Sequence, residues 1–85
     1  MATIEELNDP IDVVTVFREG RMAPVKMRWA GRAHAIARVA FCWVTRQGAY
    51  PVYHFSVVTE DGQTCEIILN TQTMQWSLIK VHLEG

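Results

Sequence analysis

The sequence predicts an all-β protein, a small antiparallel meander of about six strands that forms an SH3-like or split barrel. Short runs rich in β-branched and aromatic residues, in which apolar and polar side chains alternate, cover most of the chain. Turn signals separate these runs, and Asp61-Gly62 is the strongest of them. An apolar fraction of 49% in 85 residues supplies one core. We therefore expect a single barrel domain over residues 11–85.

The first part of the chain, residues 1–10, is expected to be a polar lead-in outside the barrel. Thr3 and Glu6 have the spacing of a capping box, which favours one helical turn, and Pro10 would end that turn. Residues 11–18 are rich in β-branched side chains and indicate the first strand. The next three residues, Glu19-Gly20-Arg21, form a short turn.

The second strand follows Pro24, which cannot donate to a ladder and is expected near a strand start or on an edge. Residues 25–30 alternate, so one side chain set faces the core and the other faces away. One face carries Val25, Met27 and Trp29, and the other carries Lys26, Arg28 and Ala30. Gly31 and Arg32 then interrupt the run as a bulge or a tight turn.

Residues 33–44 allow two interpretations. Their alanines and several apolar positions have helical spacing. As a strand, the same stretch has two apolar sets that are out of phase, which requires a bulge near Ala37-Arg38. We favour the bent strand because the flanking sequence is β throughout. Three further strands are expected over residues 52–59, 64–70 and 76–83, joined by turns.

The alternation of these strands predicts the core. The predicted core residues are Val14, Val16, Val25, Met27, Trp29, Ile36, Phe41, Trp43, Tyr53, Phe55, Val57, Ile67, Leu69, Trp76 and Leu78. Cys42 and Cys65 are too few for a disulfide framework and are expected to be small buried hydrophobes. The chain shows no signal peptide and no uncharged apolar stretch that would span a membrane, so we expect a cytoplasmic protein without membrane contact.

The charges are unevenly distributed, although the formal net charge is only −1. Residues 18–46 contain seven arginines and lysines and one glutamate, whereas acidic residues dominate both ends of the chain. Two readings are open: a basic binding face, or basic strands that pair with acidic ones across the sheet. For Arg32 in particular, a bidentate contact of its guanidinium with the carboxylate of Glu66 or Asp12 would fix the strand corner.

The basic residues are the candidate site. Cations would hold phosphates while an exposed ring stacks on an unpaired base, as in other small barrels that bind single strands. Trp29 does not fit this role, since it shares a face with Val25 and Met27. The candidate nucleic-acid-binding residues are Lys26, Arg28, Arg32, Arg38 and Arg46.

Motifs for catalysis, phosphate loops and metal sites are lacking in the sequence, so no catalytic, cofactor or metal residue is predicted. An enzyme built around Cys42, His54 and Cys65 is the third-ranked hypothesis, because neither thiol has a neighbour that would lower its pKa.

The tract from Pro24 to Ile36 resembles a family of short bacterial β proteins. They share the pattern P-x-x-F/M-x-W-x-G-R-x-Y-x-V, a further Trp and a closing W-x-L strand. The matching positions here are Pro24, Met27, Trp29, Gly31, Arg32, Ile36, Trp43, Trp76 and Leu78, with His34 in place of the usual Tyr. That replacement weakens any role for a hydroxyl group at this position. The resemblance covers most of residues 13–84.

Related domains are appended to the C-termini of some DNA-repair, polymerase-like proteins. The resemblance implies a small β domain in a setting of DNA maintenance, and it assigns no activity. We therefore expect a non-catalytic binding module for nucleic acid or for a protein partner. The alternative is a structural protein that forms homo-oligomers through an edge strand such as residues 11–18.

Overall fold

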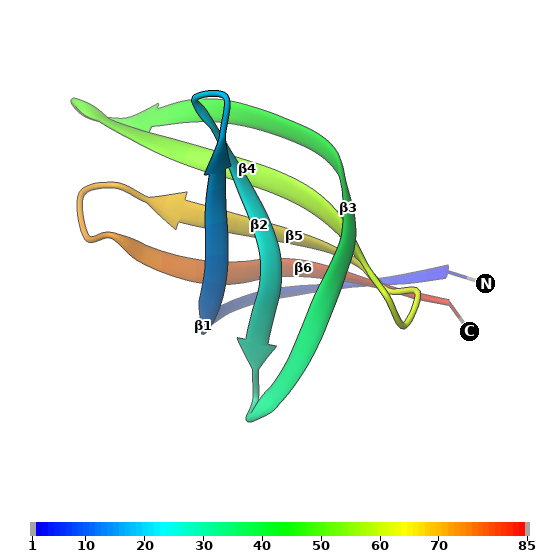
Figure 1. Ribbon diagram of the computed structural model, residues 1–85. Coiled ribbons are helices and arrows are strands. Elements are labelled where there is room, and N and C mark those ends of the chain that lie inside the picture. The colour runs from blue at the N-terminus through cyan, green and yellow to red at the C-terminus, as the bar shows by residue number, and fades with distance from the viewer. Residues whose placement is uncertain (1, 85) are drawn as a thin grey trace.

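The computed structural model describes residues 2–84, and it describes side chains for residues 6–82. Six antiparallel strands close into a barrel in sequence order (Figure 1). The strands are β1 (Ala2–Arg18), β2 (Arg21–Trp29), β3 (Arg32–Gln47), β4 (Tyr50–Thr59), β5 (Thr64–Asn70) and β6 (Gln75–Glu84). The prediction of an all-β meander of six strands that forms a small barrel is confirmed.

Two long strands, β1 and β3, each belong to both sides of the barrel. The first half of β1 pairs with β6 and its second half pairs with β2. Residues 32–35 of β3 pair with β2, and residues 36–47 pair with β4. In Figure 1 the β1–β2 hairpin consequently stands across β4, β5 and β6. This is the arrangement of an orthogonal β-packing, in which corner strands pass from one sheet to the other.

Shifts in the pairing register accompany these bends. On β3 the register shifts between Ile36 and Arg38, which confirms the bent strand with a bulge near Ala37-Arg38. A second shift follows between Val39 and Phe41, and the alternation of the sequence did not reveal it. Because side chains alternate with period two, each shift changes which residues face the core.

The start of the chain differs from the prediction. Residues 2–10 are strand rather than a lead-in with a helical turn, and they pair antiparallel with β6. Leu7 packs against the core from this segment. One helical turn is marginal in isolation, so ladder pairing and apolar contact outweigh the capping-box signal. Pro10 lies opposite Ser77, close to the point where β1 leaves β6 for β2.

The core lies between the two sides of the barrel. Its buried cluster is Ile11, Met27, Phe55, Val57, Cys65, Ile67, Leu78 and Val81. Four further residues of the predicted core, Trp29, Ile36, Tyr53 and Trp76, are partly buried and pack against it. Leu69 is also buried, whereas Val16 and Val25 are half-buried.

Three residues of the predicted core lie on the surface instead. Val14 is 56% exposed because it lies opposite Lys26 on the outer face of the β1–β2 hairpin. Phe41 and Trp43 are 71% and 40% exposed. The second register shift on β3 turns both rings outward, opposite Ser56 and His54 of β4. Cys42, predicted to be buried, is exposed as well.

Two hairpins use two-residue turns with positive φ at both positions. Glu19 and Gly20 have φ of 53° and 77°, and Ala30 and Gly31 have φ of 52° and 78°. This geometry matches the right-handed twist of the flanking strands and favours Asn-Gly, since asparagine tolerates positive φ better than alanine does.

We predict that Ala30→Asn stabilises the protein by ~0.5–1 kcal/mol, because asparagine relieves the cost of positive φ in this turn. Urea denaturation followed by far-UV circular dichroism measures the effect. Ala33→Asn, on the strand that follows, is the matched control and should not stabilise the fold. An equal gain from both variants would contradict the role of the turn.

Candidate binding surface on β2 and β3

The predicted basic residues of β2 lie where the alternation placed them. Lys26 and Arg28 are exposed on the outer face, while Met27 between them is 1% exposed and in the core. Ala35 and Ala33 of β3 lie beside them in the ladder. These two alanines add no bulk, so the cationic side chains have open space along β3.

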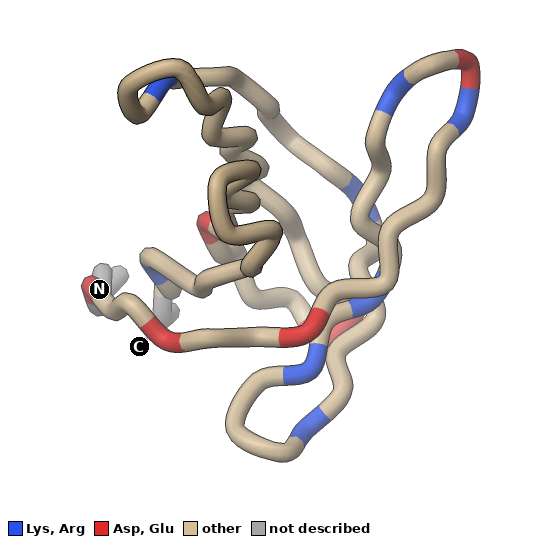
Figure 2. The backbone as a smooth tube through the Cα atoms, turned by 90° about the vertical axis from the view of Figure 1, so that its left-hand side faces the viewer, with Lys and Arg blue, Asp and Glu red and all other residues tan. Residues whose placement is uncertain are grey.

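The three candidate arginines of β3 are exposed but do not lie together. Arg38 follows the first register shift and lies opposite Val58 on the outer face. Arg32 adjoins the β2–β3 turn, opposite Trp29. Arg46 is near the β3–β4 turn, where its Nη1–H donates to the Ala49 carbonyl over 3.4 Å. Figure 2 shows the basic positions distributed along the tube, with acidic positions among them. Lys26, Arg28 and Arg38 therefore form the outer basic group.

No lysine or arginine forms an ion pair among the side chains of residues 6–82. Asp12 lies opposite Arg28 in the ladder without reaching it as an ion-pair partner. Glu66 contacts His54 rather than Arg32, so neither proposed carboxylate fixes the strand corner through Arg32. Apart from Asp12 opposite Arg28, no acidic residue lies across the ladder from the five candidate cations, and all five are exposed.

Two aromatic rings extend this outer face along β3. Phe41 is the more exposed of the two, and the Trp43 ring stacks on the His54 imidazole with centroids 5.0 Å apart and an interplanar angle of 13°. His54 Nε2 lies 2.7 Å from the Thr45 hydroxyl, and Nδ1 lies 4.0 Å from Glu66 Oε2. These contacts from three strands orient the Trp43 ring and leave part of it accessible.

Trp29 has the structural role that its alternation suggested. It is partly buried against the core, and its indole Nε1–H donates to Asp9 Oδ2 over 3.0 Å. This bond ties the end of β2 to the first half of β1. The ring that the sequence tract made most conspicuous is thus part of the barrel, and the accessible rings are those of Phe41 and Trp43.

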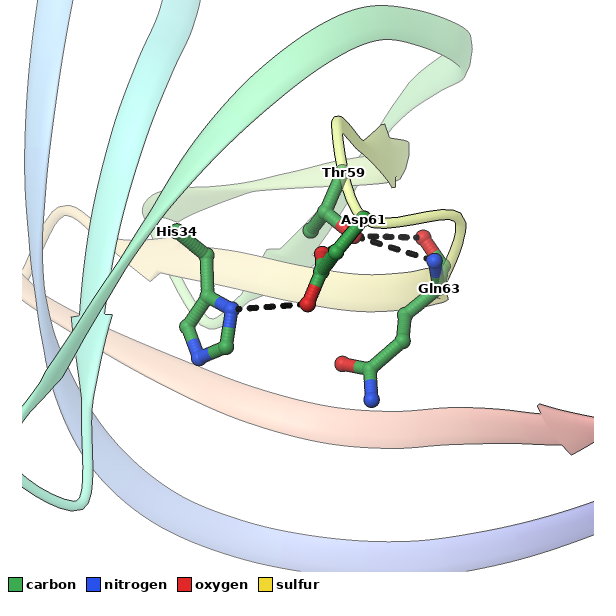
Figure 3. A network of polar contacts seen from close by, with 4 residues as sticks. All are labelled: His34, Thr59, Asp61 and Gln63. Carbon is green, nitrogen blue, oxygen red and sulfur yellow. Dashed lines mark hydrogen bonds and ion pairs between the residues drawn. The ribbon is translucent and has the colours of Figure 1, made fainter.

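A polar network fastens the bend of β3 to the β4–β5 turn (Figure 3). The Glu60 amide donates to the Ala35 carbonyl over 2.9 Å, and His34 Nδ1 lies 3.5 Å from Asp61 Oδ2. Thr59, which is 1% exposed, donates from its hydroxyl to Asp61 and accepts from the Gln63 amide. The hydrogen bond from the Thr59 hydroxyl is the largest cause that lowers the pKa of Asp61, and the nearby His34 lowers it further.

The residues of the enzyme hypothesis are dispersed. Cys65 is fully buried, and burial raises the pKa of its thiol to about 11. Cys42 lies opposite Phe55 on the inner side of β3, whereas His54 faces outward from β4. Among the described residues, no group of three or more His, Cys, Asp and Glu side chains is placed to hold a metal ion.

Comparisons of this chain with family models, curated proteins and solved structures gave no match. Residues 2–84 contain no helix with the length and apolar character needed to cross a membrane. The chemistry of the surface itself is therefore the basis for a functional assignment.

We predict that Asp61→Asn destabilises the protein in a pH-dependent way. The pKa of Asp61 in the folded protein lies below its usual value of 3.8. The stabilising contribution of its charge is therefore present above the unfolded pKa and is lost as pH falls through the folded pKa. The pH-dependent part of the stability difference between wild type and variant should be full near neutral pH and should be lost once the pH falls below the folded pKa of Asp61. Urea titrations across this range measure it, and a difference independent of pH would contradict the charged role of Asp61.

The two thiols should differ sharply in reactivity. Cys42 is exposed and should react with an aromatic disulfide reagent in the folded protein, whereas buried Cys65 should react only after unfolding. Absorbance of the released thiolate at mildly alkaline pH, with and without urea, measures both. Cys42→Ser is the control and should abolish the reaction in the folded state. Equal rates for both thiols would contradict the burial of Cys65.

Proposed function

We propose that this protein is a non-catalytic binding module that holds single-stranded nucleic acid on the outer face of β2 and β3. One observation carries the proposal: the exposed rings of Phe41 and Trp43 lie on the same face as the outer basic group. A stripe of cations that continues into aromatic rings supplies both parts of such a contact, phosphate attraction and base stacking.

Several features favour an unpaired strand over a duplex. Stacking on Phe41 or Trp43 needs a base whose face is free, which a duplex does not offer. The two alanines beside Lys26 and Arg28 allow a sugar–phosphate backbone to approach β3 closely. Small β-barrels commonly bind single strands through a sheet face in this manner. The resemblance to domains appended to DNA-repair proteins agrees with the proposal.

The charges set the expected strength and salt dependence. A net charge of −1 gives little long-range attraction, so binding depends on the local group of Lys26, Arg28 and Arg38. If each of the three cations neutralises one phosphate, log K should fall against log salt with a slope of about −2. We therefore expect micromolar rather than nanomolar affinity, and we expect it to weaken clearly with salt.

Fluorescence anisotropy of a labelled oligothymidine, titrated with the full chain at about 50 and 200 mM salt, tests the proposal. Lys26→Glu combined with Arg28→Glu should lower the affinity at least about tenfold by replacing phosphate attraction with repulsion. Phe41→Ser should lower it by about five- to tenfold, as expected for the loss of one stacked base. Both sites are exposed, so both variants should remain folded.

Arg18→Glu reverses one charge at the exposed tip of the β1–β2 hairpin, outside the outer basic group, and is the control. Its affinity should stay close to that of the wild type. Absence of salt-dependent binding, or wild-type affinity in a folded Lys26→Glu/Arg28→Glu protein, would overturn the proposal.

A further inference from the structure

The barrel is closed at one end and open along one seam. Only residues 26–29 of β2 pair with β3, so residues 21–25 of β2 have no β3 partner within the described chain. Residues 36–47 of β3 pair with β4 on one side, and no strand among residues 2–84 pairs with their other side. In Figure 1 β3 bends away from β2 above the β2–β3 turn and then crosses the top of the β1–β2 hairpin in the view. This part of β3 is an edge strand that presents unpaired backbone donors and acceptors.

The edge lacks the usual protection against strand pairing. Residues 39–45 contain no proline, glycine or charged side chain, and Phe41, Trp43 and Val44 are all 40% or more exposed. Natural edge strands are commonly blunted by lysine, proline or a covering loop, and a long apolar edge without these devices is a pairing site. Phe41 and Trp43 are exposed on one face of this strand and Val44 on the other. A strand added at the edge would therefore meet apolar side chains on both of its faces.

A groove lies beside this edge, between the β1–β2 hairpin and the β3–β4 hairpin. Its volume is about 450 Å³. Among the residues that line it are Met22, Cys42, Val44, Tyr53 and Phe55, and Arg21 adds a charge at its rim. Cys42 and Val44 lie on the opposite face of β3 from Phe41 and Trp43. Trp43 and His54 also line the groove, so it adjoins the nucleic-acid surface proposed above.

We propose that this seam binds an extended acidic segment of another protein, which adds as a strand to the free edge of β3. Alternate apolar side chains of the segment would enter the groove, and its carboxylates would meet the cations around the seam. Those cations are Arg21 at the groove and Arg38 and Arg46 at the two ends of the edge. Strand addition of this kind takes its affinity from backbone hydrogen bonds and its specificity from alternate side-chain pockets.

Charge complementarity selects this occupant over a second copy of the chain. Residues 36–47 contain two arginines and no carboxylate, so pairing this edge with a second copy would bring four arginines together without an acidic partner. None of these arginines has an ion-pair partner among the described side chains. An acidic segment would hydrogen-bond the free backbone groups of β3 and also neutralise the arginines, whereas an apolar or basic segment would leave the arginines without a partner.

The test uses the full chain and a labelled library of octapeptides in which glutamate alternates with Val, Leu, Ile or Phe. Some members should bind with a Kd of about 10–100 µM by fluorescence anisotropy, and the same peptides with lysine in place of glutamate should bind at least about tenfold more weakly. N-methylation of one alternate set of peptide amides should abolish binding, and methylation of the other set should be tolerated, because only one set faces β3.

Val44→Glu is the matched variant, since Val44 is 55% exposed and its replacement should leave the protein folded. It should lose peptide binding at least about tenfold and keep its affinity for oligothymidine, because it lies on the inner side of β3. Phe41→Ser, measured with the same oligothymidine, tests the nucleic-acid surface independently of the peptide. The two proposals are therefore tested separately.

Three outcomes would overturn the acidic-segment proposal. They are the absence of binding by any library member at millimolar concentration, equal binding of the glutamate and lysine peptides, and wild-type binding by folded Val44→Glu. Sedimentation that shows a dimer of the full chain, dispersed by Val44→Glu, would also overturn it and would identify the second copy as the occupant.

Discussion

The structure depends on the bending of two strands. Two of the six strands, β1 and β3, are long enough to pass from one side of the barrel to the other, and the barrel closes through them. Each passage needs an extra residue in the ladder, which is visible as a register shift. The shifts on β3 decide which side chains reach the core, which lie outside, and where β3 separates from β2.

The bend of β3 is held from outside the strand. The β4–β5 turn reaches across and hydrogen-bonds the Ala35 carbonyl, and Asp61 adds a contact to His34 (Figure 3). Thr59 is buried beneath the turn and keeps Asp61 and Gln63 in position. This network pins β3 just before its register shifts. The far part of β3 can therefore diverge from β2 while the closed end of the barrel stays intact.

Local sequence predicted the strands and turns because those signals depend on near neighbours. Asp61-Gly62 marked a hairpin, and two out-of-phase apolar sets marked the bulge near Ala37-Arg38. The second shift, between Val39 and Phe41, left no sign in the sequence. Phe41 and Trp43 alternate with smaller residues as core side chains do, although both are exposed. The pairing of residues 2–10 with β6 was missed for a related reason, since contacts between the chain ends override a local helical signal.

For the candidate site, the alternation of the sequence placed Lys26 and Arg28 correctly on the outer face. The separation of Arg32 and Arg46 from them follows from the fold alone.

The two proposed surfaces adjoin along the same half of β3, where Trp43 contributes to both, and their geometry couples them. A strand added at the edge would extend the sheet, so its outward carboxylates would lie beside Arg38 and the rings of Phe41 and Trp43. Phosphates on the outer face would need the same Arg38. Because a like-charged group already present disfavours a second anion, an acidic segment and a nucleic acid would oppose each other's binding, equally in both directions. The two register shifts on β3 thus produce the conditions for competition: the first places Arg38 on the outer face, and the second places the rings of Phe41 and Trp43 beside it.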